Sequence, residues 1–80
     1  MQENLTLQGG EKMNLQMLRV NAGLTQAQVA ERLEVQQSAV SRWENGANPP
    51  LQKYRVHLAA LYGCDREMID KGVEGSAKRA

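Results

Sequence analysis

Three glycines, Gly23, Gly46 and Gly63, each close a short run of residues in which apolar side chains recur at helical spacing. Glycine often follows a helix end, and the prolines of "ANPP" (residues 47–50) cannot continue a helix because they lack amide donors. No run shows the alternation that marks a strand. The sequence therefore predicts an all-α fold, a compact bundle of about five short helices.

The first two helices are placed by their apolar faces and by one cap. The first begins near Met13, and Thr25 with Gln28 three residues later forms the capping-box pattern that opens the second. Glu34 and Val35 then break the helical pattern. Residues spaced for the inward face of these two helices are Leu15, Leu18, Ala22, Val29, Ala30 and Leu33.

The remaining helices follow the same logic. The third is expected over residues 36–45, and the fourth ends at Gly63. Asp65 suits the cap of a short fifth helix that carries Met68 and Ile69. The inward residues of the fourth helix are predicted to be Leu51, Tyr54, Leu58 and Leu61.

Both ends of the chain lack this patterning. Residues 1–12 are expected to form a flexible N-terminal arm, and their stretch "ENLTLQGG" loosely resembles a protease-cleavage tag, so a tag origin stays open. Residues 71–80 are polar and are expected to form a flexible C-terminal tail. The folded domain then spans residues 13–70.

The composition of the 80 residues narrows the class of protein. A hydrophobic content of 41% with 24% charged residues is ordinary for a soluble domain, and a net charge of +1 does not by itself point to nucleic acid. A lone cysteine excludes an intrachain disulfide, and no apolar run reaches the roughly 18 residues of a membrane span. We therefore expect a cytoplasmic protein without a membrane partner.

The third helix is unusually polar on one side. Its apolar side carries Ala39, Val40 and Trp43, with Glu44 at the margin. The other side and the first turn carry short amide, hydroxyl and guanidinium groups, namely Gln36, Gln37, Ser38, Ser41, Arg42 and Asn45. Such groups match base edges and phosphates in a major groove, whereas a solvated face more often holds Glu and Lys. From composition alone, an ordinary solvated face remains open.

The stretch "LTQAQVAERLEVQQSAVSRWENG" (residues 24–46) resembles the helix-turn-helix of the lambda-repressor-like (Cro-type, XRE) regulator family. "LTQ" stands at the opening of the second helix, Val35 in the turn and "WENG" at the end of the third. "LAALYG" followed by an acidic cap continues the likeness, which runs from about residue 15 to residue 69.

The resemblance implies a role for each matching position. It places Gln26 on a DNA phosphate, and the first exposed residues of the third helix, Gln37 and Ser38, in the major groove with Arg42. Asn45 is implied to reach the DNA backbone. Gln36 and Ser41 share the same polar face and complete the candidate DNA-binding set.

Sequence-specific binding of double-stranded DNA is the function that the resemblance implies, in a transcriptional regulator whose expected action is repression. Relatives usually bind two half-sites as dimers, so a homodimer on a palindromic operator is expected, with Met68, Ile69 and Val73 as its predicted surface. The alternative is a protein-interaction module of the same fold, such as an antitoxin or an adaptor subunit.

Two positions depart from the family pattern. Many relatives have a glycine where this chain has Glu34, so the turn is either strained or different in geometry. The predicted DNA face is also weakly basic, because residues 36–55 hold only Arg42, Lys53 and Arg55 against Glu44. Few phosphates would be neutralised by one copy.

Arg19 and Glu44 are expected to form a structural ion pair. Each lies at the margin of an apolar face, where an unpaired charge would cost several kcal/mol, and the family often pairs these positions. The remaining chemistry is sparse, because His57 and Cys64 are the single residues of their types and cannot assemble a zinc site. We expect no enzymatic activity, metal, cofactor or small-molecule effector.

Overall fold

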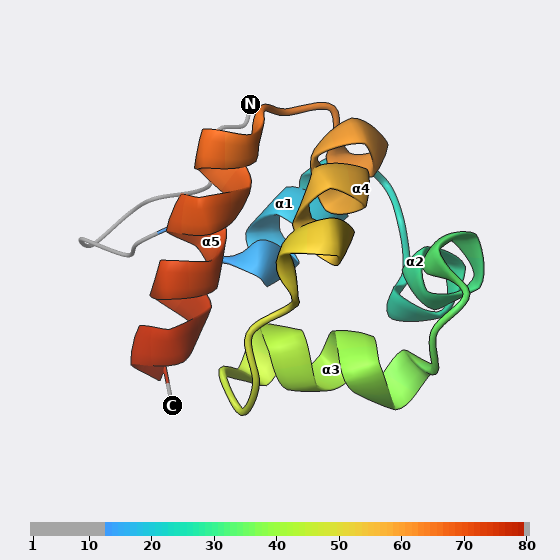
Figure 1. The fold of residues 1–80 in the computed structure, drawn as a ribbon, viewed down its shortest axis with the longest axis horizontal. Coiled ribbons are helices and arrows are strands. Elements are labelled where there is room, and N and C mark those ends of the chain that lie inside the picture. The colour runs from blue at the N-terminus through green and yellow to red at the C-terminus, as the bar shows by residue number, and fades with distance from the viewer. Residues whose placement is uncertain (1–12, 80) are drawn as a thin grey trace.

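Five helices and no strand make up residues 13–79, the part of the chain that the computed structural model describes, with side chains from 13 to 77. The helices are α1 (Leu15–Asn21), α2 (Gln26–Leu33), α3 (Gln37–Asn45), α4 (Gln52–Tyr62) and α5 (Arg66–Arg79) (Figure 1). This confirms the predicted all-α bundle. The arm predicted over residues 1–12 lies outside the described residues.

Side-chain caps mark where α1, α2 and α5 begin, and the sequence predicts the last two of them. The side chain of Thr25 accepts a hydrogen bond from the backbone of Gln28, whose side chain accepts one from the backbone of Thr25. At the start of α5, the side chain of Asp65 accepts a hydrogen bond from the backbone of Met68, without a return bond. Asn14 caps α1, which the sequence analysis missed although an asparagine before an apolar stripe is a standard signal.

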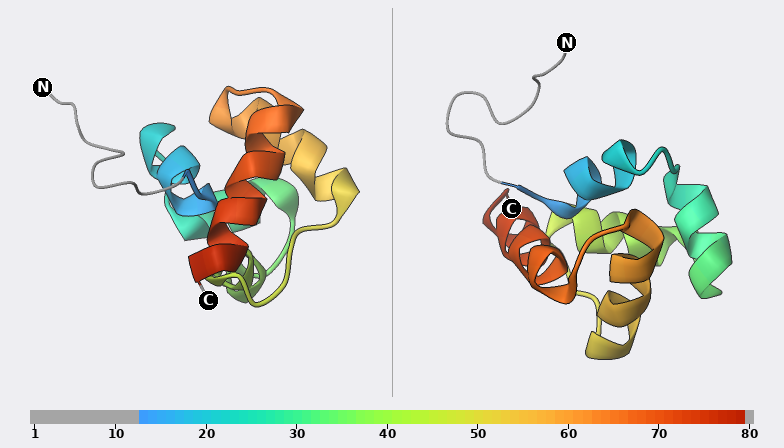
Figure 2. Two further views of the ribbon diagram at one scale, coloured as in Figure 1. Left: turned by 90° about the vertical axis from the view of Figure 1, so that its left-hand side faces the viewer. Right: turned by 90° about the horizontal axis from the view of Figure 1, so that it is seen from above.

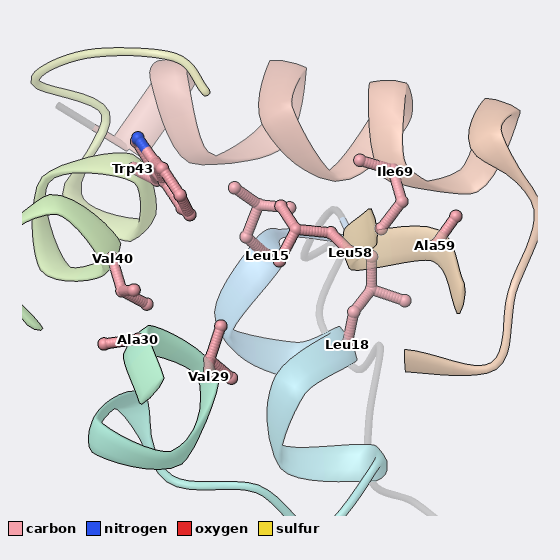
Figure 3. Packing of buried hydrophobic residues seen from close by; sticks show 9 residues of the cluster. All are labelled: Leu15, Leu18, Val29, Ala30, Val40, Trp43, Leu58, Ala59 and Ile69. Carbon is pink, nitrogen blue, oxygen red and sulfur yellow. The ribbon is translucent and has the colours of Figure 1, made fainter. Parts of the chain in front are cut away.

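The core forms where all five helices meet. Its buried apolar side chains, drawn in Figure 3, are Leu15, Leu18, Val29, Ala30, Val40, Trp43, Leu58, Ala59 and Ile69. Trp43 also contacts Tyr54, with ring centroids 5.4 Å apart. One inward prediction is wrong: Leu51 is 63% exposed, because it precedes α4 as its N-cap residue and does not share the inward face.

The C-terminal helix corrects the predicted boundary at residue 70, because α5 continues to Arg79 through the segment expected to be a flexible tail. Gly72 and Gly75 face α1 so closely that a Cβ at Gly75 would collide with the backbone oxygen of Met13. Ser76 is buried and accepts a hydrogen bond from the backbone of Leu15 at 3.0 Å. Small residues that look polar in the sequence therefore form a packed face.

The sequence predicts a dimer surface on the fifth helix, but the central residue of that surface is not exposed. Ile69 is fully buried, and Met68 and Val73 are partly buried and pack against the core. These side chains close the core of the monomer because α5 crosses α1, α3 and α4, as Figure 2 shows. They are not an exposed apolar patch.

Glu34 holds the turn between α2 and α3 in a left-handed conformation, with φ of 59° and ψ of 45°. It is the one residue other than glycine with a positive φ in residues 13–79. Side chains at such a position crowd the following carbonyl, which costs roughly 1–2 kcal/mol. The turn thus has the geometry that suits the glycine of many relatives, and the strain follows from the glutamate.

We expect Glu34→Gly to stabilise the protein by about 1 kcal/mol, because relief of the left-handed strain exceeds the added freedom of the unfolded chain. Thermal and urea unfolding measure the change. Glu31→Gly is the matched control: Glu31 is equally exposed but lies within α2, where glycine should cost up to about 1 kcal/mol. A destabilised Glu34→Gly protein would contradict the strain argument.

Candidate nucleic-acid interface

The helix α3 lies along one edge of the bundle, at the bottom of Figure 1, with one side in the core and the other in solvent. Val40, Trp43 and Glu44 are buried. The turn at Glu34 and the left-handed Gly46, whose Cβ would collide with the backbone of α5, fix the two ends of α3. The exposed side is therefore held in a fixed orientation.

Six of the seven predicted DNA-binding residues come from α3 and its N-cap. Among them Gln36, Gln37, Ser38, Arg42 and Asn45 are exposed and Ser41 is half-buried. Gln26, the seventh, is half-buried at the first position of α2 and within hydrogen-bond reach of Gln37. The tertiary structure thus brings Gln26 to the polar face of α3.

The predicted ion pair between α1 and α3 is present. The Nε of Arg19 donates to Oε2 of Glu44 at 2.6 Å, and its Nη2 donates to Oε1 at 3.3 Å. Both side chains are largely buried, 11% and 5% exposed. Arg19 also donates from Nη1 to the backbone oxygen of Leu24 at 2.8 Å, so the guanidinium joins α1, the loop before α2 and α3.

A chain of side-chain hydrogen bonds runs from this ion pair to the surface. The Nε2 of Gln26 donates to Oε1 of Glu44 at 2.9 Å, and the Nε2 of Gln37 donates to Oε1 of Gln26 at 3.4 Å. The sequence predicts a phosphate contact for Gln26 but carries no signal for its bond to Glu44, because the two residues are 18 positions apart. Separately, Asn45 donates to Ser41 at 3.5 Å.

The four charged residues of the segment 36–55, namely Arg42, Glu44, Lys53 and Arg55, do not all contribute exposed charge. Arg55 donates from Nη1 to Asp70 at 3.0 Å and from Nε to the backbone oxygen of Pro50, so it ties α4 to α5. Arg42 and Lys53 are exposed. Because Glu44 is buried against Arg19, the exposed charges that remain of these four, Arg42 and Lys53, are both positive.

Two titratable groups near the core are shifted toward their neutral forms. Burial, with a smaller effect of the Glu44 carboxylate, raises the pKa of Tyr62, and burial followed by the charge of Asp65 raises the pKa of the Cys64 thiol. A protonated thiol is a poor nucleophile. In residues 13–79 no group of three or more His, Cys, Asp and Glu side chains is arranged to hold a metal ion, and no helix is long and apolar enough to cross a membrane.

We expect Arg19→Met to reduce the free energy of unfolding by about 3 kcal/mol, because it leaves the Glu44 carboxylate buried without its cation. The double variant with Glu44→Met should recover most of the loss, since an apolar pair has no such penalty. Asp70→Asn is the control: it breaks the more exposed pair with Arg55 and should cost less than about 1 kcal/mol. If Arg19→Met and Asp70→Asn lost the same free energy of unfolding in urea, burial would not make the Arg19–Glu44 pair more important than the exposed pair.

Comparison with known proteins agrees with this geometry. The family model described as a helix-turn-helix domain matches residues 13–71, which include all of α1 to α4 and the first part of α5. No curated protein and no solved structure is similar enough to the chain to count as a match. The chain belongs to the helix-turn-helix domain family of DNA-binding proteins with regulatory roles, in keeping with its XRE-like sequence.

Proposed function

We propose that this protein binds a specific sequence of double-stranded DNA through α3 in the major groove and acts as a transcriptional repressor. One observation supports this most: α3 buries one face in the core and presents short polar side chains on the other. Groups of this kind form hydrogen bonds with base edges. A protein that binds a promoter through such a face would repress transcription by blocking access to it, which is the simplest regulatory action.

Direct reading of bases is assigned to Gln37, Ser38 and Arg42. The amide of Gln37 can donate and accept at once, which suits the N7 and N6 groups of an adenine. Ser38 is short enough to let the helix approach the groove. Arg42 lies one turn further along and can bind guanine or hold a phosphate.

Register on the DNA is assigned to Gln26 and Asn45. Only one of the two Nε2 protons of Gln26 is used by Glu44, so the second is available for a phosphate oxygen. Asn45 ends α3 and is exposed beside the loop that follows. Contacts of this type position a protein without reading sequence.

A homodimer on a palindromic operator is also proposed. Arg42 and Lys53 neutralise few phosphates, and one recognition helix reads only a few base pairs, so a single copy would bind weakly and with little specificity. Two copies related by a two-fold axis would double both the number of phosphates neutralised and the number of base pairs read. Because Ile69 is buried and cannot meet a partner, the proposed interface between two copies would use other residues.

We expect Gln37→Ala to lose about 1–3 kcal/mol on the preferred site and to relax the choice of one base pair. Gln26→Ala and Asn45→Ala should weaken all sequences alike. For Arg42→Ala, a reduced salt slope would indicate a phosphate contact and a changed base preference would indicate guanine. Selection from random duplex DNA followed by salt-dependent binding assays gives these values.

Gln16→Ala serves as the control, since Gln16 is an exposed glutamine on α1 and should leave binding unchanged. No preferred sequence for the unmodified protein, together with partner capture insensitive to Gln37→Ala, would overturn the proposal. That result would favour an interaction module such as an antitoxin or an adaptor subunit.

The dimer makes a separate prediction. A palindrome with half-sites about one helical turn apart should be bound cooperatively and more tightly than an isolated half-site. Titration of both duplexes, with the mass of each complex measured in solution, tests this. Equal affinity for the half-site and the palindrome would show that the protein binds as a monomer.

A further inference from the structure

We infer that Glu44, although buried, is a positioning residue that orients the amide with which Gln37 reads a base. The inference rests on the proposed function. It concerns the direction of the hydrogen bonds that connect Glu44, Gln26 and Gln37, which lie on two helices. Direction matters because an amide group donates at one end and accepts at the other.

The direction is set at the buried end. A carboxylate paired with Arg19 has no proton to donate, so Glu44 can only accept. The amide of Gln26 must therefore turn its Nε2 toward Glu44, where it lies 2.9 Å from Oε1. Turning Oε1 of Gln26 inward instead would place two acceptors in contact in a largely buried place.

The orientation of the Gln26 amide in turn fixes the orientation of the Gln37 amide at the surface. With its Nε2 turned inward, Gln26 presents Oε1 to Gln37, and the Nε2 of Gln37 donates to it. Gln37 is exposed, and a glutamine without such a neighbour could turn its amide either way. The chain leaves Gln37 with a free Oε1 and one free N–H.

This pattern distinguishes adenine from guanine. In the major groove adenine offers the N7 acceptor and the N6 donor, which match one N–H and one oxygen. Guanine offers two acceptors, N7 and O6, so the free Oε1 of Gln37 would face another oxygen. Glu44 thus strengthens the preference for adenine that the amide of Gln37 has by itself.

Changing Gln26 tests the direction without removing either the reader or the buried pair. In Gln26→Lys the ammonium can donate to both Glu44 and Gln37, so Gln37 must turn its Oε1 toward it and present two N–H groups to the groove. Those groups suit guanine. In Gln26→Met no polar group remains, so Gln37 can turn either way.

The measured quantity is the ratio of affinities for two duplexes that carry adenine or guanine at the base pair sensitive to Gln37→Ala. For the unmodified protein we expect a ratio of roughly 5- to 150-fold in favour of adenine. Gln26→Met should lower the ratio, because the amide of Gln37 is no longer held in one orientation, and Gln26→Lys should favour guanine. Gln16→Lys adds the same charge on α1 and should leave the ratio unchanged.

The outcomes separate this inference from the proposed function. If Gln37→Ala removes the base preference but both Gln26 variants keep the original ratio, Gln37 reads DNA and the inference is wrong. If the protein has no preferred sequence, the proposed function fails, and the free protein still tests the direction. In NMR spectra of the protein without DNA, one side-chain amide proton of Gln26 should be shifted downfield and slow to exchange, as in a bond to a carboxylate. If no amide proton of Gln26 behaves in this way, the inference is wrong.

Discussion

The buried carboxylate of Glu44 is the group on which the placement of the polar face of α3 depends. It accepts hydrogen bonds from Arg19 on α1 and from Gln26 on α2, while its own backbone belongs to α3. Three helices therefore meet at one charge. A charge in such a place is stable only when it is paired and hydrogen-bonded, so the pair contributes a fixed geometry more than net stability. The orientation of α3 follows from it.

The other support of α3 comes from the C-terminal helix. The end of α5 passes so close to Gly46 that no side chain fits there, and Gly75 approaches the backbone of Met13 in the same way. Ser76 adds a hydrogen bond to the start of α1. Because α5 touches both α1 and the end of α3, the polar face of α3 is braced at its C-terminal end as well as at Glu44. Small residues make this close approach possible.

The candidate site combines a fixed buried end with an adaptable exposed end. Glu44 and Arg19 are held by the core, Gln26 is half-buried, and Gln37 is exposed to a partner. Hydrogen-bonding groups that are oriented before a ligand arrives lose less conformational freedom when they bind it. In the proposed DNA complex, the few exposed positive charges, Arg42 and Lys53, place more weight on such contacts and on a second copy.

The sequence by itself determined the features that depend on near neighbours: the limits of α2 and α3, the capping box at Thr25, the polar face of α3 and the apolar margins that called for an ion pair at Arg19. Only the tertiary structure decided the features that join distant segments. The bond from Gln26 to Glu44 spans 18 positions and that from Leu15 to Ser76 spans 61. Helical periodicity carries no signal for such contacts, and the glycines of α5 look like a loop until α1 is packed against them.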